Sequence, residues 1–331
     1  MKQKNSFVEV VHPAALLSDT SGYLALIILD QPQEGLLYEL SLLQPQEKYK
    51  IGVIVRSSSD TMEGYIQKAR ELKIPPIFVQ SQPPLFNEIK KNHTTLSVNV
   101  ISPGSSDSND LAAQFITCPQ TANVSWIGYQ TYFTPPELLA QLQARYFSAL
   151  RLGSYRDNFK AAEPLIRSNH FNFIDLTAIR HSDAPEGSGR GPNGLYAEEV
   201  CQLARYIGVS SHLEGCFMYG FPQKIKSAQI FTQLIAQILW HLFESLSAHQ
   251  NEDPCDPSQQ VVFTPKEVYI GDQDHILHFL YSNQTGRWWI RLESPEGLYR
   301  FIPCMDEEYA MALKGELPVT WLRHYQKINL L

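Results

Sequence analysis

The sequence predicts an α/β protein with a mostly parallel β-sheet, followed by a small C-terminal extension made of a β-hairpin and helices. One observation is an apolar strand at 49–56, which is followed by a helix at about 60–72 and by a second strand at 77–79. Two strands that are joined through a helix run parallel and are usually neighbours in a sheet. A second observation is an apolar strand at 172–179, after which a loop rich in Gly, Pro and Ser leads to a helix from Ala197.

Apolar periodicity predicts the other elements of the main domain. Apolar segments of strand length are found at 23–30 (a strand or a short helix), 96–102, 124–130 and 215–221. Helices are expected at 134–151 with Thr134 as N-cap, at about 158–167, at 197–207 and at 227–247. The last of these helices carries a broad apolar face, so we expect it to pack on the sheet.

A change in composition near residue 250 divides the chain into three parts. We expect an α/β domain over 1–250, a polar linker over 251–260 and an extension over 261–331. The elements expected within the extension are a β-hairpin at 275–281 and 287–293 and helices at 305–314 and about 321–326. An extension of about 70 residues is marginally stable alone, so we expect it to dock on the main domain or on a partner.

Composition and charge exclude several classes of protein. A net charge of −7 and a pI near 5.8 argue against nonspecific nucleic-acid binding. The chain has no apolar run of membrane-spanning length, and its N-terminus lacks the apolar core of a signal peptide. Five widely spaced cysteines without a Cys-x-x-Cys pair indicate reduced thiols. We therefore expect a cytoplasmic protein without a membrane span.

The segment around the strand at 172–179 carries a recognisable pattern. From Phe173 it reads Phe-Ile-Asp-Leu-Thr-Ala-Ile-Arg-His-Ser-Asp-Ala-Pro, and Gly194-Leu195 closes the loop that follows. This pattern resembles the third signature of the ureohydrolase family (arginase, agmatinase and formimidoylglutamase), which reads roughly Ser-Phe-Asp-x-Asp-Ala-x-Asp-Pro. The resemblance implies a three-layer α/β/α, arginase-like fold. In the family, the two aspartates spaced by one residue bind a pair of manganese ions.

The same comparison shows how far the metal site departs from the family pattern. Asp175 stands at the first aspartate of the signature, Thr177 stands at the second, and Arg180 replaces the aspartate of Asp-Pro. Ser59 takes the position of the metal-binding histidine in the first signature. The three ligand positions of the second signature correspond to Asn99, Ile101 and Pro103. Of the six ligands that the resemblance implies, only Asp175 is present.

Two functions follow from the resemblance. The first hypothesis is a ureohydrolase-fold protein that has lost metal catalysis and acts as a binding, scaffold or regulatory protein, with no cofactor expected, because one carboxylate cannot hold two dications. The alternative is an active, manganese-dependent hydrolase of a guanidino or formimino compound with a rearranged site of Asp175, His181 and Asp183. In either reading, Arg180 forms an ion pair with Asp175 or points to solvent or to a helix end.

Partners are expected on weaker grounds. Ureohydrolases commonly form trimers or hexamers, so the resemblance implies a homo-oligomer, and a different protein partner fits the scaffold reading. In the extension, Trp288, Trp289 and Trp321 form either a partner surface or an aromatic contact with the main domain. Neither the substrate nor the partner follows from the sequence.

Overall fold

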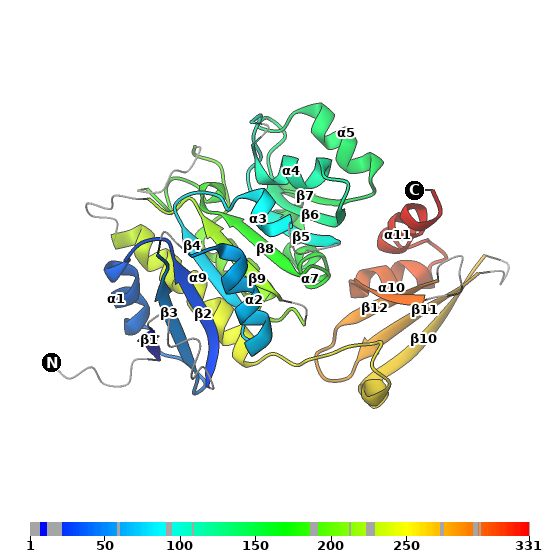
Figure 1. Cartoon of the computed structure of the whole chain (residues 1–331). Helices are drawn as coiled ribbons and strands as arrows, with labels where there is room; N and C mark the ends of the chain where they lie inside the picture. The colour runs from blue at the N-terminus through cyan, green and yellow to red at the C-terminus, as the bar shows by residue number, and fades with distance from the viewer. Residues whose placement is uncertain are drawn as a thin grey trace.

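The structure is a computed structural model. It describes residues 7–11, 22–57, 60–90, 95–107, 109–185, 191–211, 213–222, 229–271, 275–293, 297 and 299–330. Its centre is a nine-stranded sheet of order β1-β3-β2-β4-β9-β8-β5-β6-β7, in which each of the paired neighbours runs parallel (Figure 1). The strands are β1 Val8–Val10, β2 Tyr23–Leu29, β3 Lys50–Val55, β4 Pro76–Gln80, β5 Leu96–Ile101, β6 Thr121–Tyr129, β7 Ser148–Arg151, β8 Phe171–Asp175 and β9 Gly215–Tyr219.

Helices cover both faces of this sheet. They are α1 Glu34–Leu42, α2 Met62–Leu72, α3 Phe86–Lys90, α4 Leu111–Thr117, α5 Pro136–Ala144, α6 Leu152–Asp157, α7 Ala162–Arg167, α8 Ala197–Gly208 and α9 Gln229–Ser247. Residues of α1, α6, α7, α8 and α9 share one apolar core with the sheet, and residues of α2 to α5 share the other. The predicted three-layer α/β/α fold is confirmed.

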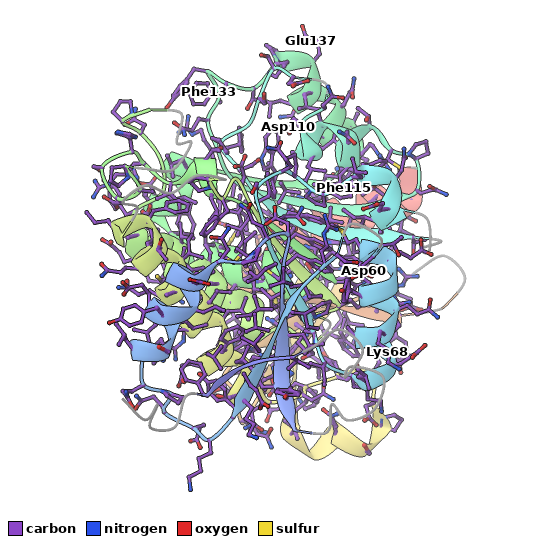
Figure 2. All side chains as sticks on the ribbon, turned by 60° about the vertical axis from the view of Figure 1, so that its left-hand side comes forward. Asp60, Lys68, Asp110, Phe115, Phe133 and Glu137 are labelled. Atoms are coloured by element: carbon purple, nitrogen blue, oxygen red, sulfur yellow. The ribbon has the colours of Figure 1, made fainter. Side chains whose placement is uncertain are left out.

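Alternation along single strands explains the two cores. In β2, Ile27 and Leu29 belong to one core and Leu26 and Ile28 to the other, because successive side chains of a strand point to opposite faces. Such strands are apolar throughout, as is usual when both faces are covered. Phe115 of α4 is fully buried in the second core, while charged residues such as Lys68 and Glu137 lie on the outside (Figure 2).

Two predicted elements and one predicted N-cap differ from the observed ones. The strand expected to reach Ile179 ends at Asp175, where a 3₁₀ turn, η3 Leu176–Ala178, begins. The helix expected over 134–151 ends at Ala144, and the chain then turns through Tyr146, which has a φ of 51°, into β7. Its N-cap is Pro135 and not Thr134, whose hydroxyl donates to the carbonyl of Gln130 at 3.1 Å.

The helix expected over 158–167 is divided, and the linker is partly helical. A 3₁₀ turn, η2 Phe159–Ala161, precedes α7, and another, η4 Pro257–Val262, lies at the end of the predicted linker. Both departures involve short, polar-rich segments in which the apolar spacing is too brief to specify one helix. The start of α9 cannot be compared with the prediction, because residues 223–228 lie outside the described residues.

The extension contains a four-stranded antiparallel sheet of order β10-β11-β12-β13. Its elements are β10 Phe263–Ile270, β11 His275–Ser282, β12 Trp288–Glu293, β13 Tyr299–Cys304, α10 Asp306–Leu313 and α11 Val319–Leu330. The predicted hairpin corresponds to β11 and β12, which pair antiparallel. Figure 1 shows the extension in orange and red beside the main sheet.

Several contacts hold the extension against the main domain. Arg323 of α11 donates to the hydroxyl of Ser148 at 2.7 Å, and Arg167 of α7 donates to the carbonyl of Trp288 at 3.2 Å. The guanidinium of Arg167 also lies 4.3 Å from the ring centroid of Trp289, which is 4% exposed. Trp289 therefore packs on the main domain. No described helix is long and apolar enough to cross a membrane.

Candidate functional site

A polar cavity of about 320 Å³ lies at the carboxyl edge of the main sheet. It is lined by residues at the ends of β8 and β9 and by the loops that follow β4 and β5. These four strands are consecutive neighbours in the sheet, in the order β4-β9-β8-β5. Loops at the carboxyl ends of parallel strands form the usual ligand edge of an open α/β sheet. The cavity is therefore our candidate functional site.

Asp175 is the carboxylate at the end of the central strand β8. Its side chain is 7% exposed, and its Oδ1 accepts the backbone N–H of Thr177 at 2.9 Å. This bond caps η3 and turns the chain away from the sheet. Gly220 lies opposite with a φ of +89°, and a Cβ built there would be 3.7 Å from Asp175 Oδ1. Asp175, Thr177 and Gly220 all line the cavity.

The loop after β5 supplies most of the remaining polar groups. Ser105 accepts the N–H of Asp107 at 3.1 Å, and Asp107 accepts the N–H of Asn109 at 2.9 Å. Asp110 caps α4 by accepting the N–H of Ala113 at 3.2 Å. Ser105, Asp107, Asn109 and Asp110 line the cavity, and none was predicted as a site residue. The available signal was a Ser- and Asp-rich loop directly after a parallel strand.

Only some of the positions that the family resemblance assigns to metal ligands line the cavity. Asp175 and Thr177 line the cavity, whereas Asn99, Ile101 and Pro103 are buried and are not among its lining residues. Asn99 donates from Nδ2 to Oδ1 of Asn172 at 3.0 Å within the sheet, and Ile101 is part of the apolar core. Ser59 lies outside the described residues.

Arg180 and Asp183 form a separate ion pair beside α8. Arg180 Nε lies 2.7 Å from Asp183 Oδ1, and its guanidinium stacks 4.0 Å from the ring centroid of Tyr196. Of the two alternatives for Arg180, the ion pair with Asp175 is not formed, because the carboxylate that Arg180 contacts is Asp183, three residues along its own loop. His181 is exposed. None of the three residues lines the cavity.

The ionisation of Asp183 follows from its contacts. Burial raises the pKa of Asp183, but the hydrogen bonds from Arg180, from the N–H of Ala197 and from Ser182 outweigh burial and hold this pKa below its ordinary value. The same contact raises the pKa of Arg180. Asp183 is thus an ionised structural carboxylate at the start of α8.

The residues at the cavity do not fit a pair of manganese ions. Two bridged dications need several carboxylates or imidazoles around them. Among the described residues, the lining offers the carboxylates of Asp107, Asp110 and Asp175 and no imidazole, and two of these carboxylates already cap backbone N–H groups. No described group of three or more His, Cys, Asp or Glu side chains has the geometry of a metal site.

Gly194 and Leu195, which match the end of the family's loop, have a structural role in the backbone. A Cβ at Gly194 would lie 2.5 Å from both the carbonyl oxygen of Ala178 and the N of Arg180. Leu195 is fully buried and forms a bridge with Ile179. Both residues therefore hold the loop against η3, and neither touches the polar cavity.

Comparisons with known proteins agree with this architecture. No family model matches the chain, and no curated protein matches it in sequence. Trypanosoma cruzi formiminoglutamase, solved with manganese, matches with a TM-score of 0.61 and 11% identity, over 71% of this chain and 98% of that protein. Agmatine ureohydrolase of Thermoplasma volcanium matches with a TM-score of 0.53 and 12% identity, over 71% and 93% of the two chains. Arginase of Bacillus cereus matches with a TM-score of 0.52 and 11% identity, over 67% and 98%.

The identities and coverages limit what can be concluded from the structural likeness. At 10–12% identity the match concerns the fold alone. Because 98% of the formiminoglutamase is matched by 71% of this chain, the chain carries additional sequence that this relative lacks. The resemblance in the segment from Phe173 to Leu195 and the structural match agree, and the chain is a protein of the ureohydrolase fold.

Proposed function

We propose that this ureohydrolase-fold protein has lost binuclear metal catalysis and acts as a binding or regulatory protein. The observation that carries the proposal is the state of Asp175. It is the only ligand-type side chain at the positions where the resemblance places metal ligands, and its Oδ1 accepts the N–H of Thr177. A carboxylate that caps a turn of its own chain already has a structural role.

The chemistry of the family supports this reading. Hydrolysis of a guanidino or formimino carbon uses a hydroxide held between two metals, which lower the pKa of the water and orient it. At the ligand positions of this chain, Ile101 and Pro103 have no donor atom, and Asn99 bonds to Asn172. The metal ligands that would generate the hydroxide are therefore missing from these positions.

The cavity itself still suits a ligand. Asp107, Asp110 and Asp175 surround it with negative charge, and Ser81, Ser105 and Thr177 add hydroxyl groups. Carboxylates and hydroxyls in this arrangement suit a small organic cation, such as an amidinium or ammonium group. Binding without turnover would keep the recognition part of the ancestral reaction and omit its chemical step.

Metal content tests the proposal directly. The full-length protein is incubated with manganese, desalted and measured by elemental mass spectrometry, and the same sample is assayed for urea, ammonia or formamide release from arginine, agmatine and formiminoglutamate. We expect near-zero metal and no release. Two metals per chain together with turnover would overturn the proposal.

A single bound metal would favour the alternative, an active hydrolase with a rearranged site of Asp175, His181 and Asp183. This alternative is supported by the likeness to solved hydrolases over 98% of their length. It requires Asp183 to leave Arg180 and Ala197, which both bond to it. In this case Asp175→Ala must abolish both the metal and the turnover, and unchanged turnover would exclude the rearranged site.

A further inference from the structure

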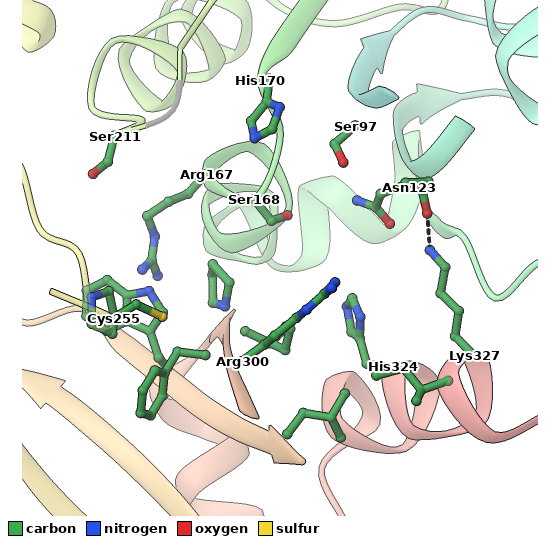
Figure 3. A pocket seen from close by; sticks show the side chains of 18 of the residues that line it. Ser97, Asn123, Arg167, Ser168, His170, Ser211, Cys255, Arg300, His324 and Lys327 are labelled. Atoms are coloured by element: carbon green, nitrogen blue, oxygen red, sulfur yellow. Dashed lines mark hydrogen bonds between the residues drawn. The ribbon is translucent and has the colours of Figure 1, made fainter. Parts of the chain in front are cut away.

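A second, larger cavity of about 740 Å³ lies at the opposite edge of the main sheet. Its walls come from the amino ends of β5 and β6, from the end of α7 and, across the gap, from β12, β13 and α11 of the extension (Figure 3). Its volume is in the range of small-molecule sites. The cavity exists because the extension packs against the main domain. It is separate from the polar cavity at the carboxyl edge.

Positive charge predominates in this lining. The cationic or imidazole side chains are Arg145, Arg167, Arg300, Lys327, His170 and His324, and the carboxylates are Glu252 and Asp253. Such an excess is notable in a chain whose net charge is −7. Figure 3 shows Arg300 extending from β13 between Ser168 and His324, toward the middle of the cavity. Because Arg167 is paired with Glu163 at 2.9 Å, the positive charge that attracts an anion comes mainly from Arg145, Arg300 and Lys327.

The two carboxylates are engaged elsewhere. Glu252 accepts hydrogen bonds from the hydroxyls of Ser282 and Thr285 and lies 3.7 Å from Arg287. Asp253 accepts the backbone N–H of Cys255 at 2.8 Å. Neither is paired with the cations that α11 and β13 bring to the cavity. Among the described residues, no carboxylate lies within ion-pair distance of Arg145, Arg300 or Lys327.

Backbone carbonyls hold two of these cations in place. Arg145 donates to the carbonyls of Ile116, Cys118 and Thr121 at 2.6–2.8 Å, and Lys327 donates to the carbonyl of Ala122. Both side chains also face the ring of Phe147, at 4.5 and 4.8 Å from its centroid. Carbonyls and an aromatic face orient a cation without cancelling its charge, so the positive field remains available to a ligand.

The pKa values of Lys327 and His324, both on α11, are lowered by burial and by neighbouring positive charge. Burial, Arg145 and Arg323 together lower the pKa of Lys327 to about 8. Burial, Lys327 and Arg323 together lower the pKa of His324 to about 4. A bound anion would reverse these effects, because an opposite charge favours the protonated form of both groups.

Two buried polar groups in the lining lack partners. The hydroxyl of Thr121, on a residue that is 2% exposed, and Nη1 of Arg167, on a residue that is 3% exposed, have no hydrogen-bond partner among the described residues. Leaving such groups unsatisfied costs about 1–3 kcal/mol each. Both atoms lie beneath the surface of the cavity wall, so they add to its polar character without contacting a ligand directly.

We infer that this cavity binds a small organic anion with phosphate or carboxylate groups and an apolar or planar portion. The cations recognise the charged groups, while Phe147, Leu292, Phe301 and Pro303 supply an apolar wall. The size of the cavity favours an organic molecule over a single inorganic ion. The ligand joins the extension to the main domain, because both contribute residues to the site.

Calorimetric titration of the full chain tests this inference. The probes are pyrophosphate and ADP for phosphate groups, citrate for carboxylates, and adenosine as an uncharged planar control. We expect at least one anionic probe to bind and its affinity to fall several-fold when ionic strength rises from about 0.02 to about 0.2 M. Binding of phosphates alone, or of citrate alone, identifies the charged group. Equal binding of adenosine and ADP, or no binding of any anion, would overturn the inference.

Matched variants locate the site. Arg300→Gln removes an exposed cation, so we expect the affinity to fall about 10-fold without loss of folding. Lys327→Gln should weaken binding at least as much. Lys314→Gln, an equal charge change on the exposed end of α10, should leave binding unchanged. Anion binding that survives both Arg300→Gln and Lys327→Gln would place the ligand elsewhere. Asp175→Asn should leave anion binding intact, which separates this test from that of the carboxyl-edge cavity.

Discussion

Asp183 accepts the backbone N–H of Ala197, the first residue of α8, at 2.9 Å. The contact joins two residues that are separated by a loop of the family signature. It places a negative charge at the positive end of a helix, where an ionised carboxylate is stabilising. The other oxygen of Asp183 lies 2.7 Å from Arg180 Nε. Asp183 thus joins the loop to the helix, a structural role that competes with metal binding.

Asp183→Asn should lower the free energy of unfolding by about 1–2 kcal/mol at neutral pH, because it removes a charged helix cap and an ion pair. The pKa of Asp183 is lowered in the folded protein. Its contribution is therefore present above the unfolded pKa and is lost as the pH falls through the lower, folded pKa. Urea unfolding of both proteins from pH 7 to pH 3 checks this. A stability difference that grows toward acid pH would contradict it.

His324 should make the protein less stable as the pH falls below 6.5. Its folded pKa is about 4, so between pH 6.5 and 4 the unfolded chain binds a proton that the folded chain does not. Stability is lost across that window. The charges that face it are Lys327 and Arg323. His324→Gln should show a smaller loss between pH 7 and pH 5 in denaturant titrations. An identical pH slope in the variant would show that His324 is solvated.

Glu163 should be the most sensitive carboxylate at the boundary between the domain and the extension. It lies 2.9 Å from Arg167 and 3.3 Å from Arg287, and the side chain of Arg167 is 4% exposed. Glu163→Gln leaves these two cations without their shared partner, so we expect a loss of roughly 3 kcal/mol of unfolding free energy. Glu71→Gln is the control, because its pair with Lys68 is exposed and should contribute less than about 1 kcal/mol. Equal effects of the two substitutions would contradict the prediction.

Gly194→Ala should destabilise the fold by about 1–3 kcal/mol, because its Cβ would lie 2.5 Å from the backbone of Ala178 and Arg180. Gly35→Ala in α1 is the control, since its Cβ would meet only a methyl group of Thr232 at 3.9 Å. Alanine is also the better helix former, so Gly35→Ala should be neutral or slightly stabilising. Thermal unfolding of both variants measures the difference. Equal melting temperatures would show that the loop backbone can move away from the added methyl group.

The candidate sites were predicted unevenly. Asp175 and Thr177 could be placed at the carboxyl-edge cavity because they end a strand whose pattern is recognisable. The loop containing Ser105 and Asp110 was missed, since a Ser- and Asp-rich loop reads equally well as a solvated surface. The position of Arg180 was left open between Asp175 and solvent or a helix end, because the side-chain direction at a turn depends on the break after Asp175, which strand periodicity does not specify.

The sequence alone determined the α/β architecture, the main strands and helices, and the likeness to ureohydrolases. These features depend on local apolar spacing and on a short contiguous pattern, both of which can be read along the chain. Only the tertiary structure decided which groups share a site. The carboxyl-edge cavity combines residues near 81, 105, 175 and 219, and the anion cavity combines residues near 121, 167, 300 and 327. Such groupings depend on strand order and on how the extension packs, which arise from long-range contacts that no local pattern encodes.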